Sequence, residues 1–185
     1  MTHATMSKPV LMIHEMCDRV FDVESLDQYI LTFDDALYTQ YLYLDVLAKI
    51  RTEKYFFIST GILADVTTKQ SPEYIDSATA HNRFRANQGD KYYMNWDQIR
   101  TISQTEYCYV GGHSHSHTFH ETIPYDYIVS DTNQMIEEFK KQLEMVPDCF
   151  CFPYNKSTNI YAEYLARKGF INQFGAERID INELL

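Results

Sequence analysis

The stretch Tyr29-Ile30-Leu31-Thr32-Phe33-Asp34-Asp35 is a short, β-rich apolar run that ends in two adjacent carboxylates. Apolar runs without alternating polarity are typical of strands that are buried on both faces of a parallel sheet. Similar runs recur along the chain, and the predicted strands are residues 10–13, 29–33, 55–60, 107–110, 150–152 and 170–174. Segments with helical spacing lie between them, at residues 36–50, 96–103, 130–145 and 159–168. This alternation predicts an α/β fold built on a parallel sheet or barrel.

The chain has the size of one domain. Its 185 residues can bury a substantial core, and neither a repeat nor a linker divides them, so we expect a single domain over residues 1–185. Residues 65–93 are polar and lack clear periodicity, which predicts a long loop with room for one helix. The four cysteines are too sparse for a disulfide framework and lack CxxC zinc spacing, so free thiols are expected. The sequence does not predict an oligomeric state.

Charge and hydropathy exclude several classes of partner. The formal net charge of -10 argues against nucleic acid and against an anionic membrane surface, because both require clustered Lys and Arg. No stretch offers the ~18–20 uninterrupted apolar residues of a transmembrane helix. Residues 1–9 are polar and lack the apolar core of a secretory signal, so we expect a cytoplasmic protein.

Polar residues that could take part in catalysis or metal binding follow the ends of four predicted strands. They are His14, Asp34 with Asp35, the run from His113 to His117, and Pro153 with Tyr154. In parallel α/β folds the carboxyl ends of the strands form one face, and active sites are built there. We therefore expect these side chains to meet in one site.

His113 and His117 lie four residues apart, which would place two imidazoles on one face of a helical turn. Two histidines plus one carboxylate, with open positions for water, form a common catalytic metal site. A flexible surface histidine patch is the alternative, but the position directly after a predicted strand favours the metal site. His115 points away from the shared face of a regular turn and is expected to be a bystander. Surface positions are expected for the other histidines without supporting context: His3, His81 and His120.

Four segments resemble motifs of the polysaccharide deacetylase family (NodB homology domains, carbohydrate esterase family 4). Thr32-Phe33-Asp34-Asp35 looks like its first motif, and His113-Ser114-His115-Ser116-His117 is similar to its second, H-[S/T]-x-x-H. The third motif is matched by Phe150-Cys151-Phe152-Pro153-Tyr154-Asn155. Between the first two, residues 93–100 resemble the stretch found ahead of the histidine motif. The order and spacing agree over residues 30–175.

The resemblance implies a distorted, incomplete (β/α) barrel with parallel strands. It also implies one divalent metal ion held by Asp35, His113 and His117. Zinc is the first expectation for that ion, although such a ligand set also accepts Co, Ni, Mn or Fe.

Catalytic roles also follow from the resemblance. Asp34 would be the general base that takes a proton from the attacking water. The backbone N–H of Tyr154 would help to hold the tetrahedral oxyanion, with Pro153 as a neighbouring substrate contact. Ser114 would orient the histidine loop.

The chain departs from the family pattern at several positions. Ala36 replaces a glycine after the Asp pair, and Asn155 replaces another glycine, although Asn tolerates a left-handed backbone. Cys151 stands where many members have an arginine that contacts the base, so Asp34 is expected to lack that partner. No histidine follows Tyr154, so the late motif that supplies a catalytic acid is absent.

The strand end Leu11-Met12-Ile13-His14 looks like that late motif moved to the N-terminus, as in circularly permuted members that act on poly-N-acetylglucosamine-type glycans. His14 would then protonate the leaving amine, and the alternative is a satisfied core histidine. Glu15, one residue further on, is a candidate substrate contact.

These features predict a metal-dependent carbohydrate N-deacetylase that removes an acetyl or formyl group from an amino sugar. The expected substrate is a surface-glycan precursor or polysaccharide, presented as a sugar nucleotide, a lipid-linked glycan or an oligosaccharide. One rival is a catalytically impaired homologue that binds glycan or a partner protein through the same cleft. Another is metal-dependent phosphoester hydrolysis, but the extra carboxylates or phosphate-clamping cations of that chemistry do not accompany these motifs.

Overall fold

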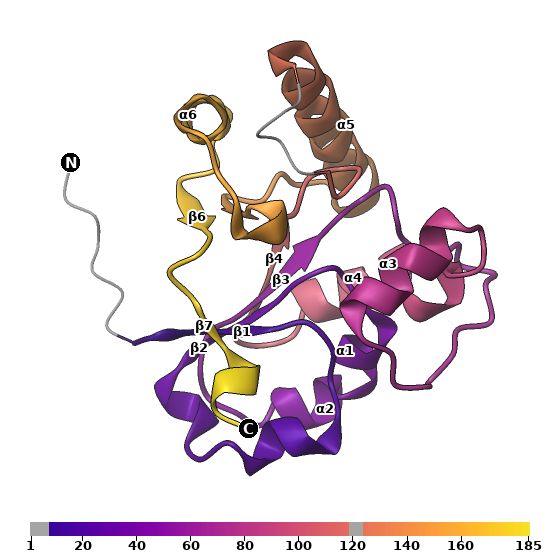
Figure 1. The fold of residues 1–185 in the computed structure, drawn as a ribbon, viewed down its shortest axis with the longest axis vertical. Coiled ribbons are helices and arrows are strands. Elements are labelled where there is room, and N and C mark those ends of the chain that lie inside the picture. The colour runs from indigo at the N-terminus through magenta and orange to yellow at the C-terminus, as the bar shows by residue number, and fades with distance from the viewer. Residues whose placement is uncertain (1–7, 119–123) are drawn as a thin grey trace.

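The computed structural model describes residues 8–118 and 124–185 (Figure 1). In these residues one seven-stranded sheet has the order β6-β5-β4-β3-β2-β1-β7, and every pairing within it is parallel. The strands are β1 (Val10–Ile13), β2 (Ile30–Phe33), β3 (Lys54–Ile58), β4 (Cys108–Gly112), β5 (Cys149–Cys151), β6 (Asn172–Phe174) and β7 (Ile179–Asp180). The predicted parallel α/β sheet is confirmed, and β7 is a strand that the apolar pattern does not predict.

The sheet is curled into an incomplete barrel. Strands β6 and β7 form its opposite edges, yet only residues 175–178 connect them. A flat sheet of seven strands would be about 29 Å wide at the usual strand spacing. The connection between β6 and β7 can span at most about 18 Å. The two edges must therefore approach each other, and Figure 1 shows the short passage from β6 to β7 in yellow.

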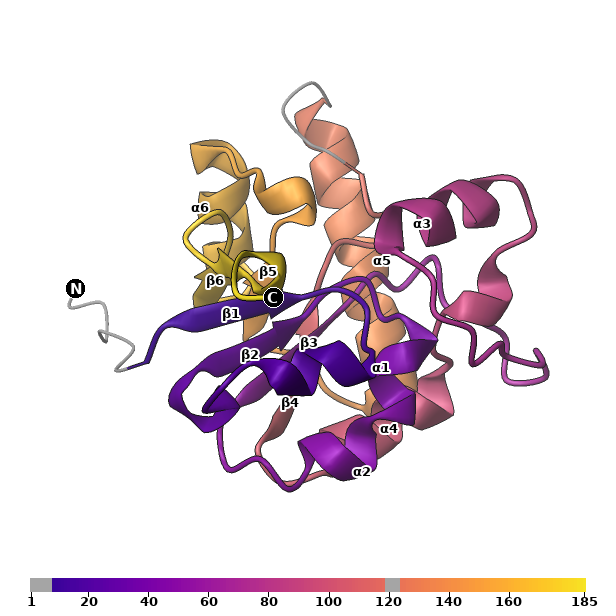
Figure 2. The same ribbon diagram turned by 60° about the horizontal axis from the view of Figure 1, so that its bottom comes forward.

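Helices surround the outside of the curled sheet in Figures 1 and 2. They are α1 (Tyr38–Leu42), α2 (Leu44–Leu47), α3 (Ser77–Arg85), α4 (Trp96–Ser103), α5 (Tyr125–Leu143) and α6 (Asn159–Arg167). The predicted helix 36–50 is interrupted at Tyr43, where ψ is 6°. The helix predicted from residue 130 begins earlier, at Tyr125. Segment 65–93 contains one α-helix, α3, which lies past the carboxyl ends of the strands (Figure 2), and a short 3-10 helix, Asp90–Tyr92.

Local capping explains where several helices start and stop. Asn95 and Gln98 form a reciprocal capping box at the start of α4. The Asp76 side chain accepts a hydrogen bond from the Thr79 N–H at the start of α3. Gly169, with φ 102°, follows α6 in a left-handed conformation that suits glycine.

Two apolar layers cover the faces of the sheet. On the outer face, strand residues such as Leu31 and Phe56 join one large core with the helices. On the inner face, a smaller cluster consists of Phe57, Cys149, Cys151 and Phe174. All four cysteines of the chain lie in the described residues and are unpaired, as expected. Among the helices of the described segments, none is long and apolar enough to cross a membrane.

Candidate active site

The predicted site residues meet at the carboxyl ends of the strands. His14 follows β1, Asp34 follows β2, His113 follows β4 and Pro153 follows β5. The Asp34 N–H donates to the Ile13 carbonyl, which aligns the ends of β1 and β2. Because parallel strands end on one side of the sheet, residues far apart in sequence converge there.

The chain turns sharply after Asp34. Asp35 has φ 71° and Ala36 has φ 59°, so two consecutive residues adopt the left-handed conformation. Ala36 therefore occupies a position that glycine would adopt more readily. The turn sends the two carboxylates to different neighbours, Asp34 toward Arg178 and Asp35 toward the histidines.

Asp35 lies at the centre of a buried histidine cluster. Its Oδ1 is 3.3 Å from His113 Nε2 and 2.9 Å from His117 Nε2. The His113 Nδ1 atom lies 2.8 Å from the Cys151 carbonyl oxygen, so an Nδ1–H donates there and leaves Nε2 facing Asp35. Burial alone would raise the pKa of Asp35, but the surrounding rings of His117 and His113 hold that pKa well below its usual range.

The histidine segment is an irregular loop, so the predicted helical turn is wrong. Ser114 and His117 both have positive φ, and the Ser114 hydroxyl accepts from the His117 N–H at 2.9 Å. This bond agrees with the orienting role expected for Ser114. From α5, the Asp131 carboxylate accepts from the His115 N–H at 2.8 Å and from the Ser116 N–H at 3.0 Å. Asp131 is a loop-positioning residue that sequence reasoning missed, since it lies on an ordinary amphipathic helix.

Asp34 has a buried partner, so the expectation that it lacks one is wrong. Arg178 donates from Nη1 to Asp34 Oδ1 and from Nη2 to Asp34 Oδ2, both at 2.7 Å. Burial opposes ionisation of Asp34, but the Arg178 charge and hydrogen bonds outweigh it and lower the pKa of Asp34 to about 2. Cys151, which stands at the usual arginine position, has its Sγ 3.5 Å from Asp34 Oδ2. The arginine thus comes from the connection between β6 and β7 instead.

His14 lies beside this pair. Its Nε2 is 3.9 Å from Asp34 Oδ2, and its side chain is 30% exposed. Glu15 points to a different set of partners: its Oε1 accepts from the Tyr74 hydroxyl at 3.3 Å, and its carboxyl interacts with the backbone of Ser77 at the start of α3. Burial raises the pKa of Glu15.

The segment after β5 forms the rim of the site. Pro153 is buried, whereas Tyr154 is 48% exposed and has φ 58°. The Tyr154 ring lies 4.9 Å from the His117 ring, and its hydroxyl accepts from Arg85 of α3 at 3.1 Å. Asn155 adopts φ 57°, the left-handed backbone expected of it, and accepts from Arg178 Nη2 at 2.5 Å.

His81 is not a surface residue, contrary to expectation. It is 8% exposed, its Nε2 lies 3.1 Å from Asp35 Oδ2, and its ring stacks on His117 at 4.2 Å. The sequence contains no signal for this placement, because a polar segment without periodicity carries His81 to the site. His3 and His120 lie outside the described residues.

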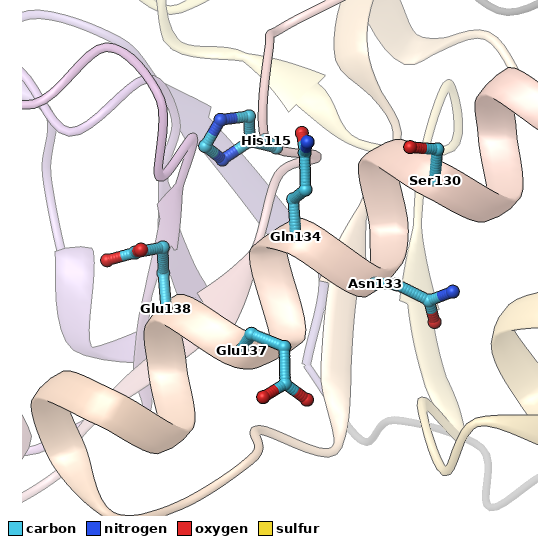
Figure 3. Close-up of a pocket in the computed structure, with 6 residues that line it drawn as sticks. All are labelled: His115, Ser130, Asn133, Gln134, Glu137 and Glu138. Atoms are coloured by element: carbon cyan, nitrogen blue, oxygen red, sulfur yellow. The ribbon is translucent and has the colours of Figure 1, made fainter.

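His115 stays apart from the cluster. Its Nδ1 lies 2.8 Å from the Thr60 hydroxyl, and its ring faces α5 (Figure 3). There it borders an open hollow of about 500 Å³ that is otherwise lined by α5 residues: Ser130, Asn133, Gln134, Glu137 and Glu138. This hollow contains neither carboxylate of the Asp pair, so the chemistry lies elsewhere.

The donor set around Asp35 fits a divalent metal ion. Oxygen and nitrogen atoms of Asp35, His81 and His117 lie within 4.8 Å of one another, all buried, and this compact group contains His81 rather than the predicted ligand His113. Asp35 Oδ1 and His81 Nε2 are buried and have no hydrogen-bond partner among the described residues. Unpartnered buried polar atoms are costly in a folded protein, and an ion held between them would compensate that cost.

Comparison with solved structures shows the same fold in several other proteins. IcaB from Ammonifex degensii superposes with a TM-score of 0.65 at 19% identity, over 94% of this chain and 85% of that one. The BpsB deacetylase domain from Bordetella bronchiseptica gives a TM-score of 0.66 at 13% identity, over 91% and 88% of the two chains. BA3943, a carbohydrate esterase family 4 pseudoenzyme from Bacillus anthracis, gives 0.54 at 16% identity, over 79% and 42%.

The sequence itself matches a family model. No curated protein matches the chain in sequence. The model for polysaccharide deacetylase matches residues 26–172, which include Asp34, Asp35 and both predicted histidine ligands but neither His14 nor Arg178. This match covers most of the chain and agrees with the parallel half-barrel. The chain belongs to the polysaccharide deacetylase family.

Proposed function

We propose that the chain is a metal-dependent hydrolase that removes an N-acyl group from an amino sugar. The observation that carries the proposal is the ion pair of Asp34 with Arg178 beside the cluster of Asp35, His113 and His117. Family membership and the NodB-type fold support the same chemistry.

Asp34 is suited to act as the general base. Its pKa of about 2 keeps it ionised near neutral pH, and the two Arg178 hydrogen bonds fix its orientation. An ionised, immobile carboxylate can accept a proton from the attacking water without reorganisation. A divalent ion held by Asp35, His113 and His117 would supply Lewis acidity that activates water and polarises the acyl oxygen.

His14 is the proposed general acid. The ring is 30% exposed, and its position 3.9 Å from Asp34 Oδ2, next to the proposed base, supports this role. Protonation of the departing nitrogen completes cleavage of the C–N bond, so the products are a free amine and a carboxylate. The Tyr154 N–H remains the proposed oxyanion donor.

The proposed substrate is an N-acetylated or N-formylated sugar of a surface-glycan precursor or polysaccharide. The half-exposed Tyr154 ring beside His117 supports this, because aromatic faces with a polar tip pack well against sugar rings. Pro153 is buried, and the Glu15 carboxylate accepts a hydrogen bond from Tyr74, so Tyr154 is the better candidate for sugar contact.

A base without an arginine partner would favour the impaired-homologue alternative, but Asp34 is paired with Arg178. One experiment distinguishes deacylation from glycan binding without catalysis. Protein treated with a chelator and then reloaded with zinc or cobalt is assayed for acetate release from an N-acetylglucosamine oligomer. Metal-dependent release is expected. Binding of the oligomer without release by any metal-loaded form would favour the binding module and contradict the proposal.

A further inference from the structure

We propose that His81 is a fourth protein ligand of the metal ion, joining Asp35, His113 and His117. The inference rests on the proposed function, because it concerns the same ion. It assigns a metal-binding role to segment 65–93, which lies between the first two family motifs and carries α3.

The two oxygens of Asp35 face different histidines. Oδ1 faces His113 and His117, whereas Oδ2 lies 3.1 Å from His81 Nε2. Despite this short distance, His81 Nε2 makes no hydrogen bond and is shielded from solvent. Donor atoms on one ion typically lie this close to each other without bonding each other. A shared cation therefore explains the spacing better than a contact between His81 and Asp35 alone.

The other nitrogen of the His81 ring is already engaged. His81 Nδ1 lies 2.9 Å from the hydroxyl of Tyr93, which is fully buried. Metal-binding histidines usually donate their second ring N–H to a neighbouring acceptor, which fixes the tautomer and the ring orientation. With Nδ1–H donating to the Tyr93 oxygen, the lone pair on Nε2 points to the cluster.

The backbone around Tyr93 holds this arrangement against the Asp pair. Tyr93 forms a β-bridge with Leu37, and the Met94 N–H donates to the Ala36 carbonyl at 2.8 Å. From α3 itself, Arg85 donates to Tyr154 on the opposite rim of the site. The His81 ring also stacks on the His117 ring, which further restrains its orientation. His81 is thus held in place by contacts that do not depend on the ion.

Four protein ligands would favour a metal ion that takes more than four ligands. Catalytic zinc sites usually have three protein ligands and one position for water, because zinc favours four ligands. Three histidines and one carboxylate would leave room for water only on an ion that takes five or six ligands. Such ions include cobalt, nickel, manganese and iron.

The test uses metal-free protein titrated with Co²⁺ and followed by visible absorption, in wild type, His81→Gln and His81→Ala. Glutamine keeps an N–H that can reach Asp35 but is a poor metal ligand. Both variants should lose affinity about tenfold or more and show an altered cobalt spectrum. His115→Gln is the matched control, because His115 lies between His113 and His117 in the histidine loop but its ring contacts Thr60. Thermal unfolding of the metal-free variants checks that they fold.

The outcomes separate this inference from the proposed function. Wild-type protein that binds no cobalt would overturn both. Wild-type binding together with an unchanged spectrum in His81→Gln would overturn the His81 ligand alone, whatever the change in affinity. A changed spectrum in both His81 variants, with His115→Gln like wild type, is the expected result.

Discussion

Arg178 donates two hydrogen bonds of 2.7 Å to the two carboxylate oxygens of Asp34, a residue 144 positions earlier in the chain. The same guanidinium donates to Thr32 at 3.0 Å and to Asn155, and its Nε donates to the Gly175 carbonyl at 3.1 Å. The Arg178 side chain is 1% exposed. One buried cation therefore joins β2, the segment after β5 and the connection between the two sheet edges.

We expect Arg178→Gln to reduce both stability and activity. Removing one member of a buried ion pair leaves an uncompensated charge, which costs about 3–5 kcal/mol. Urea unfolding gives the change in the free energy of unfolding, and acetate release gives the change in rate. The matched control is Arg100→Gln, whose ion pair with Asp97 is solvent-exposed and should contribute about 1 kcal/mol or less. Equal stability of Arg178→Gln and Arg100→Gln would show that the ion pair of Arg178 with Asp34 does not stabilise the fold.

His14→Gln tests the proposed acid. Loss of a general acid lowers kcat by about 10²–10⁴-fold. KM and metal affinity should stay near their wild-type values. Among the described residues, no hydrogen bond or ion pair joins His14 to Asp35 or to the histidine loop. Steady-state kinetics and a cobalt titration on the same preparation measure both quantities. A His14→Gln enzyme with wild-type kcat would assign the proton donor to another group.

Asp131→Asn tests how the histidine loop is held. The Asp131 carboxylate accepts from two loop N–H groups and from the Ser116 hydroxyl, and asparagine offers only one acceptor oxygen. We expect a loss of about 1–3 kcal/mol in unfolding free energy and weaker metal binding. Asp126→Asn, at an exposed position of the same helix, is the control and should change neither. Normal metal affinity in Asp131→Asn would mean that the loop holds its shape without α5.

Gly61→Ala probes the packing of the same loop against the end of β3. A Cβ at Gly61 would lie 2.7 Å from the His115 carbonyl oxygen and 2.9 Å from His115 Nε2. Because a backbone atom is involved, the loop must shift, and we expect a loss of about 1–3 kcal/mol in thermal or urea unfolding. Gly175→Ala is the control, since its nearest neighbour is the Glu177 carboxylate at 3.3 Å, which can move. A stable Gly61→Ala protein would show that the loop tolerates displacement.

The sequence predicts much of the site because the geometry of parallel sheets is general. Apolar runs identify six strands, and the candidate catalytic and metal-binding residues at their carboxyl ends must converge on one face of the sheet. His14, Asp34, Asp35 and His113 are therefore placed together without knowledge of the fold's details.

Other parts of the site depend on tertiary packing that leaves no local pattern. Strand β7 has two residues, too few to show periodicity, so neither the strand nor the role of Arg178 just before it is predictable. His81 lies in a polar stretch of sequence without periodicity, and tertiary contacts, among them that of its ring with the Tyr93 hydroxyl, bring it to the cluster. The histidine loop adopts two left-handed residues because Asp131 and Ser114 bond its backbone, which overrides the helical spacing.

The measurement that tests the central claim most directly is acetate release by metal-loaded Asp34→Asn protein, compared with wild type at equal metal occupancy. Asn removes the proton acceptor and keeps the size of the side chain, while Asp35, His113 and His117 remain to bind the ion. We expect the wild type to release acetate from an N-acetylglucosamine oligomer and the variant to be slower by about 10²–10⁴-fold with its metal retained. An Asp34→Asn protein as fast as wild type would contradict the assignment of Asp34 as the base at the centre of this site.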